Sequence, residues 1–227
     1  TLLFNLWYVI ALKGYEEMNQ LAGEAEEAAW ARTTADKLRK VFHRTFWNGK
    51  YYISPGYQGK PDDRAQALAV VSGVLPKELY PVIRPFFSTW YHASPYMEKY
   101  VLEALCTMGY YQDALNRMKL RYRVMIESPL TTLWEGWGIG SEGFGGGTYN
   151  HAWSGGPLTI LSQYIAGIET LEPAFRTFRV APHPAHLNFI RTQVPLSGGR
   201  RIVFEMDKSA HSGTMYLRVP EGTSAQV

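Results

Sequence analysis

Apolar residues recur at helical spacing through the first part of the chain. The stretch 3–21 carries them at intervals of three and four residues, and Gly23 ends the pattern. The next stretch, 24–46, is amphipathic and keeps one charged face. An Asn48-Gly49 pair then predicts a turn with a short extended piece over 47–52. These patterns predict that the chain opens with a helical hairpin.

Start and stop signals place the next helices. Pro61-Asp62-Asp63 predicts a helix start just before the apolar stretch 64–71. A less regular helix is expected over 79–87, because prolines stand at 76, 81 and 85. Ser94 is expected to cap a helix over 96–108 that begins with Pro95 and is closed by Gly109.

Two more helices complete this part of the chain. One covers 111–125, with Asp113 in its first turn and basic residues late, which is the arrangement that the helix dipole favours. The other is expected to start near Trp153 or Pro157 and to run to Ile168. Helices joined by short turns indicate antiparallel hairpins arranged around a common axis.

The helices differ in how apolar they are. The segments 65–71 and 156–168 are apolar nearly all round, so we expect them to be buried on both sides, as the inner helices of a double-layered toroid are. The segments 24–46 and 111–125 keep a charged face and are expected to be outer helices. The predicted fold class is therefore mainly α, with helical hairpins in a double-layered toroid.

The periodicity changes from helical to alternating after Pro173. Strands are predicted at 175–180, 190–194, 201–206 and 214–219, with turns at 197–199 and 209–213. This pattern predicts a small antiparallel region without parallel pairing, at the start of a β-sandwich. The predicted domains are a helical-hairpin domain over 1–172 and a β-sandwich segment over 173–227.

Composition excludes several classes of function. The net charge is only +3, and no basic cluster interleaves with aromatic residues, so a nucleic-acid partner is not expected. The apolar segment 2–12 is too short to cross a bilayer, so no membrane partner is expected. The six histidines show no paired helical spacing, and no metal or other cofactor is expected. The lone Cys106 lies in an apolar helical pattern and is expected to be buried and structural.

The candidate chemistry gathers between residues 131 and 156. A carboxylate stands between two tryptophans, and an Asn-His pair follows a glycine-dense loop over 136–147. Glycine costs backbone entropy to order, so this loop indicates a tight turn or a close approach to a ligand. Aromatic rings can cover apolar sugar faces, while an acid handles a proton or a water. The candidate residues are Trp134, Glu135, Trp137, Asn150 and His151.

Each candidate also has a structural explanation. Glu135 could be a loop carboxylate that accepts backbone hydrogen bonds, and His151 could be a buried histidine that bonds a loop carbonyl. The two tryptophans could be core rings. Tyr96 and Glu98 could line a cavity, but helix packing and a surface carboxylate are the preferred explanations. His92, just before the Ser-Pro cap, is a weaker candidate.

A series of short motifs follows in a characteristic order. They are Ala93-Ser-Pro-Tyr96, Leu102-Glu-Ala-Leu105 with Gly109, Thr131-Thr-Leu-Trp-Glu135, Asn150-His151, Gly155-Gly156-Pro157, Tyr164-Ile-Ala-Gly-Ile168 and the passage from Pro173 to Pro182. Together they resemble bacterial α-L-rhamnosidases of glycoside hydrolase family 78. The resemblance covers most of the chain and implies an (α/α)6 barrel followed by a β-sandwich. It also implies hydrolysis of terminal α-L-rhamnosides with inversion.

The resemblance also implies roles for the candidate residues. Glu135 matches the general base of the family, and His151 matches its sugar-contacting histidine. Trp134, Trp137, Asn150 and Tyr96 are the further substrate-binding candidates.

An inverting enzyme needs two carboxyl groups, of which one protonates the leaving oxygen and the other activates a water. The family's acid segment, of the Gly-Trp-Thr-Gly-Asp type, is not found in this sequence. The nearest acidic pair, Asp62-Asp63, is better explained as a helix cap.

We therefore expect a fragment, the second half of the barrel plus the first strands of the sandwich. Such a fragment would be inactive alone. Its exposed apolar helices would pack against the missing part of its own protein or against another copy.

Two other functions stay open at this point. One is a different glycosidase on the same toroid, of the fucosidase or glucosidase type, because a fold alone does not separate substrates. The other is a non-catalytic helical module that binds a sugar or a partner. An acid segment upstream in the parent gene would favour an enzyme, and its absence there would favour the binding module.

Overall fold

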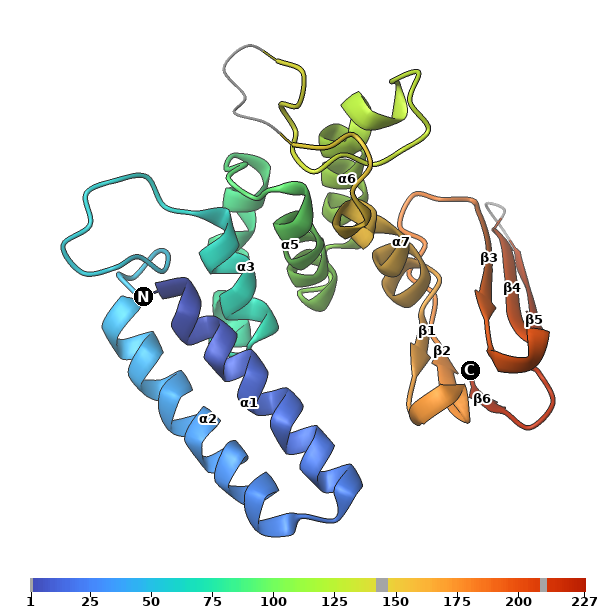
Figure 1. Cartoon of the computed structure of the whole chain (residues 1–227), viewed down its shortest axis with the longest axis horizontal. Helices are drawn as coiled ribbons and strands as arrows, with labels where there is room; N and C mark the ends of the chain where they lie inside the picture. The colour runs from blue at the N-terminus through green and yellow to red at the C-terminus, as the bar shows by residue number, and fades with distance from the viewer. Residues whose placement is uncertain (1, 142–146, 209–211) are drawn as a thin grey trace. The chain divides into compact units, whose positions relative to one another are not determined.

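The computed structural model describes residues 2–141, 147–208 and 212–227. Helices come first along the chain and strands last, as the change in periodicity predicts (Figure 1). The chain divides into two compact units, residues 1–109 and residues 110–227.

The first unit opens with the predicted hairpin. Helix α1 (Leu2–Ala22) and helix α2 (Ala25–Phe46) pack against each other along their length, and Gly23 turns the chain between them at a φ of 82°. The turn after α2 is also confirmed, because Trp47 and Tyr52 form a β-bridge around it. Small and apolar side chains make the contact between the two helices, namely Leu12, Ala31, Ala35 and Leu38.

Helix α3 (Asp63–Val71) lies at the centre of the first unit. It packs against α1 and against α5 (Pro95–Thr107), and it is buried along almost its whole length. Both predicted caps are confirmed: the Asp62 side chain accepts from the amide N–H of Arg64, and the Ser94 hydroxyl accepts from that of Met97.

The segment between α3 and α5 is irregular, as its prolines predict. It consists of the short elements η1 (Lys77–Leu79), α4 (Tyr80–Ile83) and η2 (Arg84–Ser88). This segment still buries the side chains of Ile83 and Phe87.

The second unit begins with α6 (Tyr111–Ile126), close to its predicted bounds. The last helical segment is broken into η3 (Ala152–Gly155), α7 (Gly156–Ile160) and the π-helical turn η4 (Leu161–Ile165). The prediction of a helix to Ile168 is wrong at its end, because Ile168 opens strand β1. Gly167 makes the change of direction at a φ of 69°, and a Cβ there would lie 1.9 Å from the carbonyl oxygen of Ala181.

The six strands found in the described ranges form two small sheets. The first sheet contains β1 (Ile168–Thr170), β2 (Thr177–Val180) and β6 (Ser224–Gln226), and the second contains β3 (Phe189–Pro195), β4 (Arg201–Lys208) and β5 (Gly213–Arg218). The predicted antiparallel pairing holds for every pair except one. Strand β6 pairs parallel to β2, so the prediction of no parallel pairing is wrong there.

One buried cluster joins the two sheets to the helical part of the second unit. Apolar side chains from both sheets meet Leu115 of α6 and Ile165 of η4 in it. The two sheets thus share a core, as the layers of a sandwich do. The residues of the predicted turn at 209–211 lie outside the described ranges. The predicted domain boundary at 172/173 stays a prediction, and β1 precedes it.

Candidate active site

Two short backbone segments hold the main candidates side by side in the second unit. The amide N–H of Glu135 donates to the carbonyl oxygen of Thr148 over 2.9 Å, and that of His151 donates to Leu133 over 2.8 Å. The hydroxyl of Thr132 donates to the carbonyl oxygen of Tyr149 across the same pair. This pairing brings together residues that the sequence separates by a glycine-rich loop.

The glycine-rich loop itself turns tightly at its described start. Gly140 has a φ of 80°, and a Cβ at this position would lie 2.1 Å from the hydroxyl oxygen of Tyr149. Glycine is therefore favoured at position 140 for two reasons, its positive φ and the closeness of the Tyr149 hydroxyl. Residues 142–146 of the loop lie outside the described ranges.

Glu135 is anchored through one carboxylate oxygen. Its Oε2 accepts from the amide N–H of Thr148 over 2.9 Å and lies 3.3 Å from the hydroxyl of Thr148. Nδ1 of His151 lies 3.6 Å from the same oxygen. The side chains of Glu135 and His151 are each 32% exposed, so both are open to a ligand or to water.

A third tryptophan completes this group. The ring of Trp153 packs against the imidazole of His151 at 4.2 Å between centroids, and its indole N–H donates to the carbonyl oxygen of Glu135 over 3.2 Å. The ring is 44% exposed. In the sequence, Trp153 stands out only as a possible helix start, and Thr148 does not stand out at all. The signal for Trp153 was an aromatic residue two positions after the candidate histidine.

The two predicted tryptophans have different surroundings. Trp134 is only 7% exposed and meets Tyr149 edge to face at 5.1 Å. Its ring therefore packs against the second of the two paired segments. Trp137 meets Tyr122 edge to face at 5.0 Å, and the guanidinium of Arg121 lies 4.3 Å from its centroid. Both rings are thus well packed, and sugar contact by either ring stays a prediction.

The other predicted contacts are more exposed. Asn150 is exposed and lies between Thr148 and His151 in the paired segment. Tyr96 belongs to α5 in the first unit, where its ring lies 5.8 Å from that of Tyr100 and is 40% exposed.

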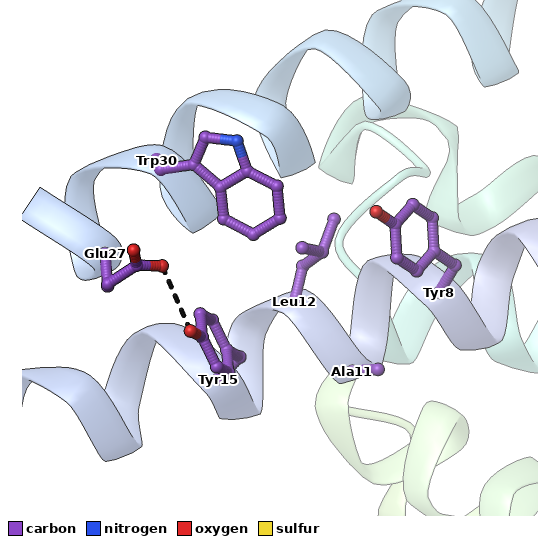
Figure 2. A pocket seen from close by; sticks show the side chains of 6 residues that line it. All are labelled: Tyr8, Ala11, Leu12, Tyr15, Glu27 and Trp30. Atoms are coloured by element: carbon purple, nitrogen blue, oxygen red, sulfur yellow. Dashed lines mark hydrogen bonds between the residues drawn. The ribbon is translucent and has the colours of Figure 1, made fainter.

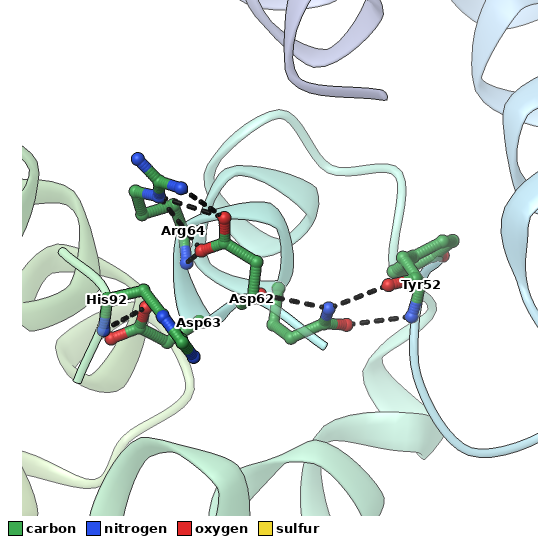
Figure 3. Close-up of polar contacts among 6 residues, drawn as sticks. Tyr52, Asp62, Asp63, Arg64 and His92 are labelled. Carbon is green, nitrogen blue, oxygen red and sulfur yellow. Dashed lines mark hydrogen bonds and ion pairs between the residues drawn. The ribbon is translucent and has the colours of Figure 1, made fainter. Parts of the chain in front are cut away.

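The first unit holds the remaining acidic and histidine candidates (Figure 3). Asp63 is fully buried and accepts from the amide N–H of His92 over 3.1 Å, while Asp62 forms an ion pair with Arg64. A cavity of about 400 Å³ lies here, lined by Tyr52, Tyr57, Lys60, Asp62, Arg64, His92 and neighbouring residues. Glu98 is also fully buried, so its explanation as a surface carboxylate is wrong.

Two further cavities are not lined by the main candidate residues, Glu135 and His151. One of about 500 Å³ lies on the α1–α2 hairpin, where Tyr8 and Leu12 face Trp30 and the Tyr15 hydroxyl donates to Glu27 (Figure 2). That hydrogen bond raises the pKa of Tyr15. The other, of about 620 Å³, is an apolar groove between α6 and the α7–η4 segment.

Three further predictions concern a cysteine, metal ligands and membrane-spanning helices. Cys106 is buried, as predicted, and this burial raises the pKa of its thiol to about 12. Among the described residues, no three His, Cys, Asp or Glu side chains gather as metal ligands would. Within the same ranges, no helix is both long enough and apolar enough to span a bilayer.

The chain thus forms helical hairpins followed by two small sheets, and a carboxylate lies beside an imidazole and an indole in the second unit. The chain belongs to the bacterial α-L-rhamnosidase family. Residues 1–165 match the bacterial alpha-L-rhamnosidase 6 hairpin glycosidase domain, and residues 167–227 match the bacterial alpha-L-rhamnosidase C-terminal domain. The predicted family and fold class are thus confirmed.

Solved structures agree with this assignment. The GH78 rhamnosidase of Bacillus sp. GL1 is 26% identical, with a TM-score of 0.78 over 97% of this chain. The α-L-rhamnosidases of Dictyoglumus thermophilum (20% identical) and Streptomyces avermitilis (17% identical, solved with L-rhamnose) each give a TM-score of 0.80 over 97% of this chain. The chain spans 26%, 26% and 22% of these three proteins. No curated protein matches the sequence.

Proposed function

We propose that this chain carries the general-base half of the active site of an inverting α-L-rhamnosidase, with Glu135 as the base. The substrate class is a glycoside with a terminal α-L-rhamnose. The proposal rests on family membership together with one observation: a partly exposed carboxylate held beside His151 and Trp153.

The geometry of Glu135 suits a general base. All the hydrogen bonds described for its side chain go to Oε2, and both come from Thr148. A base must be ionised, correctly oriented and able to accept one more proton. The anchored oxygen provides the orientation, so we assign proton abstraction from the attacking water to Oε1.

His151 and Trp153 supply the sugar-binding surface beside the base. The exposed indole of Trp153 offers an apolar face for a pyranose ring, whose carbon-bound hydrogens pack well on aromatic surfaces. His151 offers the ring nitrogen that points away from Thr148 to a sugar hydroxyl. Asn150, Trp137, Trp134 and Tyr96 remain proposed contacts.

The general acid lies outside these 227 residues in this proposal. An inverting site needs an acid and a base on opposite sides of the sugar. The chain spans about a quarter of its solved relatives, which leaves room elsewhere in a longer protein for the acid. The chain alone is therefore expected to be inactive.

The test is the substitution Glu135→Gln in the longer enzyme that carries this chain, assayed on an aryl α-L-rhamnoside. Turnover should fall by about 10²–10⁴-fold, because the amide cannot accept the water proton. Glu127→Gln is the matched control: its carboxylate pairs with Arg123 on the surface and should be dispensable for turnover. Near-normal turnover by Glu135→Gln would rule this residue out as the base.

A further inference from the structure

The hydroxyl of Thr148 lies within hydrogen-bonding distance of the side chains of both Glu135 and His151. Its hydroxyl lies 3.3 Å from Oε2 of Glu135 and 3.0 Å from Nδ1 of His151, and its amide N–H also donates to that Oε2. The direct distance from Nδ1 to Oε2, 3.6 Å, is too long for a hydrogen bond. The hydroxyl therefore stands between the base and the imidazole as their common partner.

The donors and acceptors of Glu135, Thr148 and His151 allow one consistent set of hydrogen-bond directions. A threonine hydroxyl has one proton to donate, and an ionised carboxylate can only accept. If the hydroxyl donated to His151, its lone pairs would face the carboxylate at 3.3 Å, which is repulsive. The hydroxyl must instead donate to Glu135, and Nδ1 of His151 must then carry the proton that it donates to the hydroxyl.

This arrangement has a consequence for the sugar-binding face of His151. With the proton on Nδ1, the neutral imidazole presents Nε2 as an acceptor, and an acceptor matches the hydroxyl proton of a sugar. We propose that Thr148 is a positioning residue that orients the carboxylate of Glu135 and holds His151 in the Nδ1–H tautomer. The inference rests on the proposed function of Glu135.

Three substitutions in the longer enzyme separate the parts of the Thr148 side chain. Thr148→Val keeps the shape and removes the hydroxyl, and we expect kcat to fall about 10- to 100-fold because the base loses its orientation. KM should rise as well, because His151 is then no longer held in the tautomer that accepts a sugar hydroxyl. Thr148→Ser keeps the hydroxyl and should restore kcat to within about threefold of the parent enzyme. Thr148→Ala should behave like Thr148→Val.

A matched control separates loss of the orientation of Glu135 from loosening of the backbone pairing between 132–135 and 148–151. Thr132 also donates its hydroxyl across the pair, but to the carbonyl oxygen of Tyr149 and not to the site. Thr132→Val should therefore leave kcat close to that of the parent enzyme. An equal loss in Thr132→Val and Thr148→Val would overturn the inference, since loop stability would then explain both.

A measurement independent of turnover reports on the tautomer. Nitrogen-15 NMR of histidine-labelled enzyme should show the proton of His151 on Nδ1 in the parent and in Thr148→Ser. Thr148→Val should lose this preference. A proton on Nε2 in the parent would overturn the inference.

The Glu135→Gln variant, assayed in parallel, separates the two proposals. Loss of turnover in Glu135→Gln with full kcat in Thr148→Val overturns the role of Thr148 alone. Retention of turnover in Glu135→Gln overturns both.

Discussion

Two helices with nearly the same apolar character have opposite surroundings in this protein. In α3, the side chains of Ala65, Ala67 and Leu68 are fully buried. In the α7–η4 segment, Ile160 and Ile165 are buried, but Leu158 is 72% exposed and Leu161 is 38% exposed. The prediction that both helices are buried on both sides is therefore confirmed for α3 and wrong for α7–η4.

The difference comes from the neighbours and not from the helices. Helix α3 has α1 on one side and α5 on another, both supplied by this chain. The exposed leucines of α7–η4 line an apolar groove of about 620 Å³, together with Met118, Tyr122 and Ile126 of α6. Apolar periodicity thus indicates that a helix has an apolar surface, but it does not show which element covers that surface.

The largest expected effect contrasts one buried leucine with one exposed leucine. Leu68→Ala should lower the free energy of unfolding by about 2–5 kcal/mol, because it leaves a cavity in a fully packed core. Leu158→Ala should change it by less than about 0.5 kcal/mol, because that side chain is exposed. Urea denaturation of each variant, followed by circular dichroism, measures both values. Equal losses would show that α7 is as well packed as α3.

A smaller effect is expected on self-association of the purified chain through the apolar groove between α6 and the α7–η4 segment. Exposed apolar surface of this kind favours association, so light scattering should detect species larger than a monomer. Leu158→Glu places a charge in the groove and should weaken association by about tenfold or more. Leu120→Glu is the control, because Leu120 is 60% exposed on α6 but does not line the groove. A strict monomer, or equal effects of both variants, would contradict this use of the groove.

Much of the fold could be predicted from local signals. The Asp62 and Ser94 caps and the Asn48-Gly49 turn depend on neighbouring residues, and all three are observed. The wrong prediction that a helix ends at Ile168 has a cause that is not local. It depends on the close approach of Gly167 to Ala181, a contact between residues distant in sequence, which periodicity does not report.

In the candidate site, too, a contact between residues distant in sequence could not be predicted from local patterns. Glu135 and His151 stood out because their residue types and their motifs point to sugar chemistry. Thr148 did not, because a threonine after a glycine run has no distinctive pattern. Its role depends on the backbone pairing of 133–135 with 148–151, which places its hydroxyl between the two candidates. A positioning residue is thus recognised by what it touches rather than by its type.

The central claim is that Glu135 activates the water that attacks the sugar from the face opposite the leaving group. The most direct test is Glu135→Ala in the longer enzyme, assayed on an aryl α-L-rhamnoside with and without sodium azide. The variant should be nearly inactive alone, and azide, which needs no base, should restore turnover from the space that the side chain leaves. Displacement with inversion predicts β-L-rhamnosyl azide as the product, identified by proton NMR. An α-configured azide, or full turnover without azide, would contradict the account.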